Sequence, residues 1–199
     1  MINILFDAIN KENKEICKIL IEKIKEKDPV DPWASDITAL QTAVSSRNLE
    51  ICKILIKHAD NPNPADDIYA DTALHDAAVN GDIDIFKLIM EHSGESNPSN
   101  RRGQTALHHA VRDGNLEICK FIVQNAGNIN EPDHNNQTPL HYAFECEEEG
   151  MLIFKFKFSP LDVNPLVTIQ KLCGQQGVGK WSKICHFCPR LVHKKCPWR

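Results

Sequence analysis

Four side chains of the types that bind metals lie close together near the C-terminal end of the sequence. Cys185, Cys188, His193 and Cys196 follow the pattern Cys-x2-Cys-x4-His-x2-Cys, in which x is any residue. Two cysteines in one tight turn and a histidine and cysteine on one helical turn suit the tetrahedral coordination of zinc. We therefore expect either no cofactor at all or one zinc ion held by these four residues.

A second stretch of the same region resembles a phosphate-binding loop. The segment GQQGVGK (174–180) matches the first seven positions of that pattern. The next residue must carry a hydroxyl to hold magnesium, but it is Trp181. Only 19 residues follow Lys180, which is too few for the rest of a parallel α/β domain. We therefore expect no nucleotide binding.

The charge of the chain changes sign near Gly150. Residues 1–150 contain 14 Lys and Arg against 26 Asp and Glu, a net charge of −12, whereas residues 151–199 contain 9 against 1, a net charge of +8. Such a break marks a domain boundary. No apolar run approaches the length that spans a bilayer, and no basic segment precedes the apolar residues at the N-terminus. We therefore expect a cytoplasmic protein, with the nucleus as the alternative.

The first 145 residues contain an internal repeat. One fragment recurs every 33 or 34 residues, as TALQTAV (38–44), TALHDAA (72–78), TALHHAV (105–111) and TPLHYAF (138–144). A second fragment follows it, as EICKILI (50–56), DIFKLIM (84–90) and EICKFIV (117–123). A weaker copy of the pair lies at LFDAI (5–9) and EICKILI (15–21). The chain is therefore built of repeated units of two segments each.

Each unit has the pattern of two short amphipathic helices. In the fourth copy, Leu107, Ala110 and Val111 form one apolar stripe at helical spacing. Thr105 can cap this helix, and Gly114 can end it in a left-handed turn. Helices of this length are not stable alone, so each must bury its stripe against the neighbouring copy. The sequence therefore predicts an all-α solenoid.

The repeated unit resembles the ankyrin repeat, in which a glycine stands two residues before Thr-Pro-Leu-His and Gly-Ala-Asp-x-Asn follows the second helix. The match is best at 103–130 and covers about residues 3–145. The resemblance implies an ankyrin-repeat solenoid of four to five helix-turn-helix repeats in a domain of residues 1–150. It also implies that His75, His108 and His141 hold the turns by hydrogen bonds. The expected repeats are approximately 3–32, 33–66, 67–99, 100–132 and 133–150, or to 164.

Two copies depart from the ankyrin pattern. The first lacks the threonine, the histidine and the preceding hairpin turn, which is typical of an N-terminal capping repeat. The second has Gln41 in place of the histidine and Arg47 in place of the glycine. Both replacements are expected to weaken local order in the second repeat without changing the fold.

The resemblance also implies a binding surface. In such solenoids the hairpin tips and the first helices line a concave groove, and a partner protein lies across several repeats. Burial in the core does not explain the presence of Trp33, Ile68 and Tyr69 on the turn tips. Aromatic residues and arginine are the usual anchors of interfaces. The residues expected on or near this surface are Trp33, Ile37, Ile68, Tyr69, Arg101, Arg102, Gln104, Arg112, His134, Asn135 and Tyr142.

The basic tail, residues 151–199, resembles part of a treble-clef zinc finger. The segment WSKICHFCPRLVHKKC (181–196) carries the string shared by plant homeodomain fingers and diacylglycerol-binding fingers. In those families the two halves of the string serve different zinc ions, and each half needs further ligands elsewhere. Within the tail only Cys173 precedes the string. Three alternatives stay open: one zinc bound by the four residues, a truncated finger, or a poorly defined, disordered tail.

The ankyrin resemblance implies a non-enzymatic protein-interaction module or scaffold, and no Ser-His-Asp or Cys-His constellation can be assembled from the sequence without arbitrary choices. Its partner is expected to be another protein, and the chain itself a monomer. The alternative is a zinc-dependent regulatory protein whose finger is formed by residues 185–196. Binding of nucleic acid or of an anionic membrane through the basic tail is a third and disfavoured hypothesis.

Overall fold

The computed structural model describes residues 1–24, 28–31, 37–61, 63–66 and 68–145. Trp33 and the whole of residues 146–199, including the four predicted zinc ligands, lie outside this part. The described residues form nine helices and no strand. These are α1 (Ile2–Asn10), α2 (Lys14–Lys23), α3 (Ala39–Ser45), α4 (Leu49–His58), α5 (Ala73–Asn80), α6 (Ile83–Ser93), α7 (Ala106–Arg112), α8 (Leu116–Asn125) and α9 (Pro139–Glu145). None of these helices is both long enough and apolar enough to cross a lipid bilayer.

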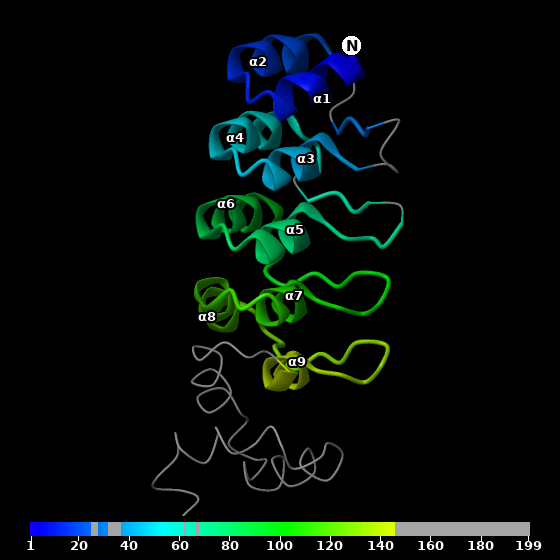
Figure 1. Ribbon diagram of the computed structural model, residues 1–199, viewed down its shortest axis with the longest axis vertical. Coiled ribbons are helices and arrows are strands. Elements are labelled where there is room, and N and C mark those ends of the chain that lie inside the picture. The colour runs from blue at the N-terminus through cyan, green and yellow to red at the C-terminus, as the bar shows by residue number, and fades with distance from the viewer. Residues whose placement is uncertain (25–27, 32–36, 62, 67, 146–199) are drawn as a thin grey trace, which may run out of the picture. The chain divides into compact units, whose positions relative to one another are not determined.

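The helices lie in two layers (Figure 1). The first helices of the repeats, α1, α3, α5, α7 and α9, each pack against the next, and the second helices α2, α4, α6 and α8 do the same. The two helices of each pair also pack against each other. Four helix pairs and α9 correspond to the five copies in the sequence, which confirms the predicted all-α solenoid.

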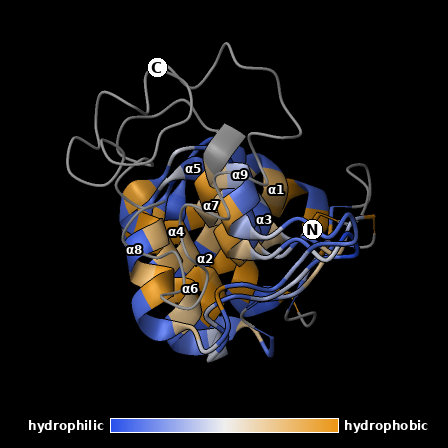
Figure 2. Cartoon of the chain, turned by 90° about the horizontal axis from the view of Figure 1, so that it is seen from below, coloured by the Kyte–Doolittle hydropathy of each residue, from blue (hydrophilic) through white to orange (hydrophobic). Residues whose placement is uncertain are grey.

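The core consists of residues at the repeated positions. Ile51, Ile85 and Ile118 occupy one such position in α4, α6 and α8, and all three are fully buried. Another position in the second helices holds Cys17, Cys52, Phe86 and Cys119, also fully buried. Hydrophobic residues therefore gather on the helices, whereas the hairpin loops are mostly hydrophilic (Figure 2). Burial of one stripe per helix stabilises the whole stack.

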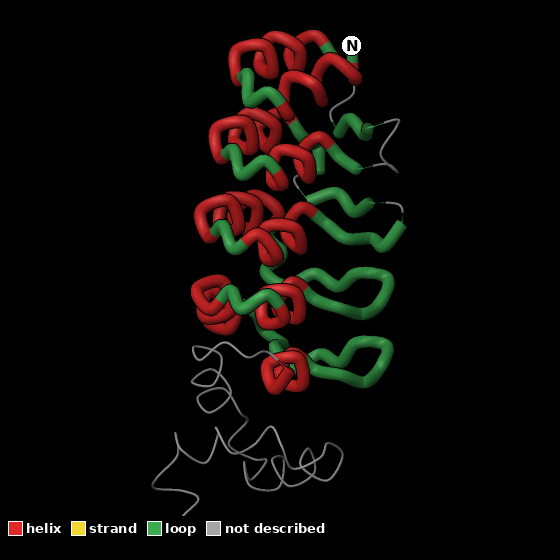
Figure 3. The backbone as a smooth tube through the Cα atoms, viewed as in Figure 1, coloured by secondary structure: helices red, strands yellow, loops and turns green. Residues whose placement is uncertain are grey.

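Hairpin loops precede the first helices of the later repeats, and they extend from the same side of the stack (Figure 3). In the fourth repeat, the side-chain oxygen of Asn100 accepts hydrogen bonds from the backbone N–H groups of Arg102 (2.9 Å) and Gln104 (3.0 Å). Gly103 lies within this turn at a φ of 71°, and a Cβ there would lie 2.9 Å from His134 Cδ2. The turn therefore requires glycine, both for its left-handed conformation and for the close approach of the next loop.

Histidines in the first helices join neighbouring repeats. The backbone N–H of Thr105 donates to His108 Nδ1 (2.9 Å), and His108 Nε2 lies 3.0 Å from the carbonyl oxygen of Gln137 in the next loop. Because Nδ1 accepts, the proton must be on Nε2, which then donates to the carbonyl. His75 makes the same pair of contacts, with Nε2 3.2 Å from the carbonyl oxygen of Gln104. This confirms the structural role predicted for these histidines.

The second repeat has Gln41 at the position of the histidine. Gln41 Oε1 accepts a hydrogen bond from the Thr38 N–H (3.0 Å), and Gln41 Nε2 donates to the carbonyl oxygen of Asp71 (3.1 Å). An amide therefore makes both bonds of the histidine, so the replacement does not remove the hydrogen-bonded link to the next repeat. Arg47 does depart from the third and fourth repeats, because it adopts a φ of 55° where those repeats have Gly81 and Gly114, and Glu12 does the same in the first repeat. A left-handed backbone is costly for any residue with a Cβ.

Candidate functional site

Ten of the eleven residues predicted to contact a partner lie in the described part of the chain. Ile37, Ile68 and Tyr69 are exposed on the hairpin loops to 37%, 48% and 46%. The other exposed members of the set are Arg101, Arg102, Arg112, His134 and Asn135. Tyr142 is half-buried. Gln104 is buried, at 8% exposure.

The loops of the third, fourth and fifth repeats are joined at their tips. The backbone N–H of Arg101 donates to the carbonyl oxygen of Tyr69 (2.8 Å), and that of His134 donates to the carbonyl oxygen of Arg102 (2.9 Å). The Arg101 guanidinium also donates to the carbonyl oxygen of Ile68 (3.1 Å). We call Ile68, Tyr69, Arg101, Arg102 and His134 the tip surface. Its backbone is held in place by hydrogen bonds between successive loops.

The Arg102 guanidinium lies over the aromatic ring of Tyr69, with 4.6 Å between its central carbon and the ring centroid. This is a cation–π contact between neighbouring repeats. It restricts the rotamers of both side chains before any partner binds. The structure therefore brings together, at adjacent loops, an aromatic residue, two arginines and an exposed isoleucine, all of which the sequence predicted for a binding surface.

The first helices add a row of equivalent residues. The position that follows the histidine of the repeat is occupied by Asp7, Thr42, Asp76, His109 and Tyr142 in α1, α3, α5, α7 and α9. We call these five residues the groove row. Sequence reasoning found Tyr142 but missed Asp76 and His109. Both residues follow directly after the repeated histidine, and this position in the repeat is the sequence signal that could have identified them.

Tyr142 is positioned by two residues of the neighbouring loops. Gln104 Nε2 donates to the Tyr142 hydroxyl (2.7 Å), which in turn donates to Asp133 Oδ2 (2.9 Å). The Tyr142 ring also contacts His108 edge to face, with 5.3 Å between ring centroids. Burial and the Asp133 carboxylate raise the pKa of Tyr142, so the hydroxyl stays protonated. Gln104 therefore orients a residue of the groove row and does not itself present a contact surface.

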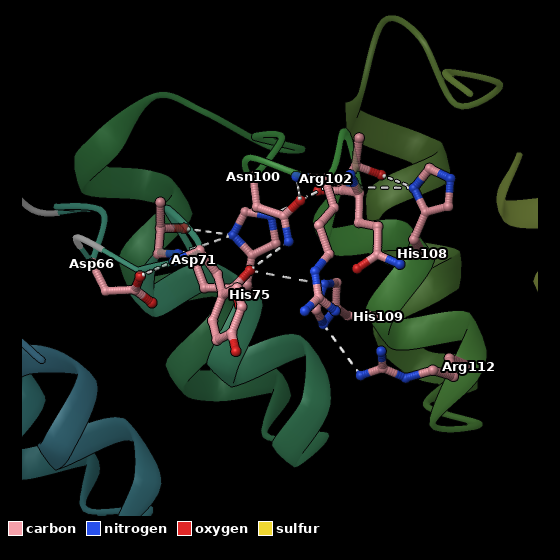
Figure 4. Close-up of polar contacts among 12 residues, drawn as sticks. Asp66, Asp71, His75, Asn100, Arg102, His108, His109 and Arg112 are labelled. Atoms are coloured by element: carbon pink, nitrogen blue, oxygen red, sulfur yellow. Dashed lines mark hydrogen bonds and ion pairs between the residues drawn. The ribbon is translucent and has the colours of Figure 1, made fainter. Parts of the chain in front are cut away.

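His109 is the most enclosed member of the groove row, at 6% exposure (Figure 4). Its Nδ1 lies 3.4 Å from Arg112 Nη2, and its Nε2 lies 3.9 Å from Asp71 Oδ1. Burial, together with His75 and Arg112, lowers the pKa of His109 to about 3. The ring is therefore neutral, and its contact with Asp71 is not an ion pair. Within the described repeats His109 Nε2 makes no hydrogen bond.

Asp76 is the member of the groove row on α5, and its carboxyl group has an unusual pKa. Burial, with a further contribution from the Asp71 carboxylate, raises the pKa of Asp76 to about 7. Among the described residues no ion pair joins Asp76 to a basic side chain. The groove row therefore carries a carboxyl group at α5, whereas Arg112 on α7 and the arginines of the tip surface make the fourth repeat basic.

Asp71, Asp76, His75 and His109 lie near one another, but no group of three or more such side chains in the described part has the geometry to hold a metal ion. Several polar side chains, such as Asn100 and Gln104, fix a loop or another side chain. The arrangement offers both signs of charge, an aromatic ring and apolar area on a preorganised backbone.

Comparison with known proteins agrees with the architecture. The family model for ankyrin repeats (3 copies) matches residues 5–100 and 93–154, which is well over half of the chain. A comparison with curated proteins gives no significant match. Ankyrin repeats are in general protein–protein interaction modules. The chain belongs to the ankyrin-repeat family.

Proposed function

We propose that this chain is a non-enzymatic interaction module or scaffold that binds a partner protein across the concave groove. The tip surface and the groove row are the contact region. The supporting observation is the tip surface, where Tyr69 and Arg102 stack on each other and Ile68 is 48% exposed beside them. Tyrosine and arginine are the residue types that most often dominate binding energy.

The tip surface is suited to binding because it is ordered in advance. Hydrogen bonds between the backbones of successive loops fix Tyr69, Arg101, Arg102 and His134. A partner therefore does not have to order these loops when it binds, which would otherwise cost about 0.5–1.5 kcal/mol per immobilised long side chain. A surface held in this way can recognise a folded or an extended segment of a partner with little loss of conformational entropy.

The charges define the chemistry of the partner. Arg101, Arg102 and Arg112 are exposed on the fourth repeat and favour carboxylate groups of the partner at that level. Asp71 and Asp76, one repeat earlier, favour a lysine or arginine. The partner segment therefore carries acidic side chains opposite the fourth repeat and a basic side chain opposite the third.

The test uses charge reversal in the full-length chain. Proteins captured by the wild-type chain are identified by mass spectrometry, and the affinity of the main purified partner is then measured with the Arg101→Glu/Arg102→Glu variant. We expect a loss of at least tenfold, because repulsion replaces two attractive contacts. The matched control is Lys57→Glu/Lys120→Glu, which reverses two exposed charges on the second helices. Equal affinity of the wild type and the arginine variant would remove the tip surface from the interface.

Zinc binding by the tail is a second proposal, and it is supported by the spacing of Cys185, Cys188, His193 and Cys196. In this alternative the repeats position a small regulatory finger. Metal analysis of the purified full chain tests it directly. We expect one equivalent of zinc, which is lost in a Cys185→Ser variant and retained in a Cys173→Ser control. A wild-type chain purified without zinc, even after incubation with zinc ions, would refute the proposal.

A further inference from the structure

Two carboxyl groups of the third repeat lie near each other. Asp76 belongs to the groove row on α5, and Asp71 lies at the end of the hairpin loop that precedes this helix. Burial raises the pKa of Asp76, and the Asp71 carboxylate is the next largest cause of that increase. Both residues are half-buried, so a side chain of a partner can still reach them. We call Asp71 and Asp76 the acid pair.

The side chains beside Asp71 are neutral. Asn100 Nδ2 donates a hydrogen bond to Asp71 Oδ1 (2.7 Å). His109 Nε2 points toward the same oxygen but lies 3.9 Å from it, and within the described repeats this buried nitrogen has no hydrogen-bond partner (Figure 4). Burial lowers the pKa of His75, and it lowers the pKa of His109 to about 3, so neither imidazole supplies a positive charge. Asp71 therefore has hydrogen-bond donors beside it but no counter-ion.

The elements around Asp76 do not neutralise it either. The helices α3, α6 and α7 pack against α5. From α3, a hydrogen bond from the neutral amide of Gln41 lowers the pKa of Asp76 but does not cancel the larger effect of burial, and Asp66 in the preceding loop adds a further negative charge. On α7, the guanidinium of Arg112 donates to Asp113 Oδ2 (3.2 Å). The buried residues of α6 are all apolar, namely Ile85, Phe86 and Ile89.

The described repeats contain no counter-ion for the acid pair. None of their lysines or arginines forms an ion pair with Asp71 or Asp76, and Arg102 is held over the Tyr69 ring. A partly buried carboxylate without a counter-ion is costly, and Asp76 therefore keeps its proton to an unusually high pH. The side chains present lack the geometry to hold a metal ion. The cation that suits the acid pair is therefore an ammonium or guanidinium group, which carboxylates bind by charge-assisted hydrogen bonds.

We propose that a lysine or arginine side chain of the partner binds the acid pair, and that it does so only after Asp76 has lost its proton, so that binding tightens as the pH rises. This inference rests on the proposed function, because it concerns the third repeat of the same groove. A positive charge beside Asp76 lowers the pKa of that carboxyl toward its ordinary value of 3.8. One proton therefore passes from Asp76 to the solvent when the basic side chain binds.

The size of the effect follows from the ionised fraction of Asp76. A carboxyl group with a pKa of about 7 is about one-tenth ionised at pH 6 and about nine-tenths ionised at pH 8. Because only the ionised form binds the cation, the observed Kd equals the intrinsic Kd divided by this fraction. The Kd is therefore expected to fall about tenfold between pH 6 and pH 8.

The test uses a synthetic peptide as the probe. It consists of glycine and serine with one arginine and one glutamate three residues apart, and its ends are blocked by acetyl and amide groups. In an extended segment three residues span about 10 Å, which is close to the distance between packed neighbouring helices, so its two charges can face the third and fourth repeats. Neither charge of the peptide changes between pH 6 and pH 8. The peptide is titrated into the isotope-labelled full chain at both values of pH, and NMR chemical shifts give its Kd and the residues that it contacts.

We expect the peptide to contact α5 and α7, with a Kd about tenfold lower at pH 8 than at pH 6. The carboxyl carbon of Asp76 should then titrate at a lower pH when the peptide is bound. Asp76→Asn should bind with the same weak affinity at both values of pH. The matched control is Asp84→Asn, which removes an exposed carboxyl of the same repeat from α6 and should keep the tenfold difference. A peptide with glutamine in place of arginine should show no dependence on pH.

Three results would overturn the proposal. The first is an equal Kd at the two values of pH, and the proposed function would stand if the peptide still contacted the groove. The second is a dependence on pH that persists in Asp76→Asn, because it would belong to another group. The third is the absence of peptide binding at both values of pH, in which case the captured partner and the Arg101→Glu/Arg102→Glu variant would still decide the proposed function. Binding that depends on pH through Asp76 would support the acid pair even if that arginine variant removed the tip surface from the interface.

Discussion

Replacing His108 tests whether the hydrogen bonds between repeats stabilise the stack. The structure offers a direct comparison, because Gln41 makes the same two bonds in the second repeat that His108 makes in the fourth. His108→Ala removes both bonds. His108→Gln keeps a side-chain oxygen for the Thr105 N–H and a side-chain N–H for the Gln137 carbonyl. The two variants should therefore differ widely in stability.

The expected magnitude follows from the contacts of His108. The alanine variant loses two hydrogen bonds and leaves the Thr105 N–H and the Gln137 carbonyl without partners, each at a cost of about 1–3 kcal/mol. It also loses the edge-to-face contact with Tyr142. We expect a decrease of about 3–5 kcal/mol in the free energy of unfolding for His108→Ala, and of about 1 kcal/mol for His108→Gln.

Urea denaturation followed by far-ultraviolet circular dichroism measures the two differences. In a thermal melt they correspond to decreases in Tm of roughly 10 °C and roughly 3 °C for a domain of this size. If the alanine and glutamine variants lost the same stability, the bonds to Gln137 and Thr105 would contribute nothing, and packing of the ring would have to explain the position. If neither variant lost stability, the coupling between repeats would not depend on this histidine.

Three further predictions concern single residues of the stack. Arg47→Gly is expected to raise the free energy of unfolding by about 0.5 kcal/mol in urea denaturation, because glycine adopts the φ of 55° without the cost of a Cβ; an unchanged or lower value would contradict this. Gly81→Ala is expected to lower the free energy of unfolding by about 2 kcal/mol or more, because φ is 75° and the added Cβ would lie 2.5 Å from Asn115 Oδ1. The Asn115 side chain also donates hydrogen bonds to carbonyl oxygens at the end of α5, so it cannot move away without losing them. A neutral result would show that this turn relaxes freely. Asp76→Asn tests the pKa of about 7. Because this pKa lies above the ordinary value of 3.8, protonation of Asp76 favours the folded protein. The contribution of the protonated carboxyl to the free energy of unfolding is complete below pH 4 and is lost as pH rises through 7. The variant should therefore gain stability relative to the wild type between pH 5 and pH 8, and parallel curves of stability against pH would refute the assignment.

A fourth prediction concerns acid sensitivity. Burial lowers the pKa of His75, His108 and His109, so the unfolded chain takes up protons at these groups more readily than the folded protein does. Their contribution to stability is complete above the ordinary histidine pKa of about 6.5 and decreases as pH falls below it. His108→Gln should therefore flatten the loss of stability between pH 7 and pH 5, as measured by urea denaturation at each pH. An unchanged slope would contradict the neutral state of His108.

The repeat could be predicted from the sequence because its signals are local. Threonine, histidine and glycine at fixed spacing specify the start of a helix, the bond to the next loop and the left-handed turn, and each recurs in register. Gln41 could not be assessed in this way. Its equivalence to histidine depends on the distance between its amide oxygen and nitrogen in the folded repeat, which a residue type alone does not reveal.

The candidate surface was predictable only in part, for a similar reason. Tyr69, Arg101 and Arg102 could be placed on the tips from their position in the repeat. Gln104 was expected on the same surface but is covered by Tyr142 of the next repeat. Asp76 has a raised pKa because it is buried and the Asp71 carboxylate lies near it, and such surroundings are not encoded in any single repeat.

The buried cysteines have a practical consequence for studying motion in this protein. Cys17, Cys52 and Cys119 lie in three different helix pairs and are fully enclosed. Burial raises the pKa of the Cys17 thiol, and that of Cys52 to about 12, so neither forms the reactive thiolate in the closed state. Alkylation by a maleimide must then wait until the surrounding helices separate. The rate at which each cysteine gains mass in a labelling time course would measure how often its own helix pair opens, without any engineered probe.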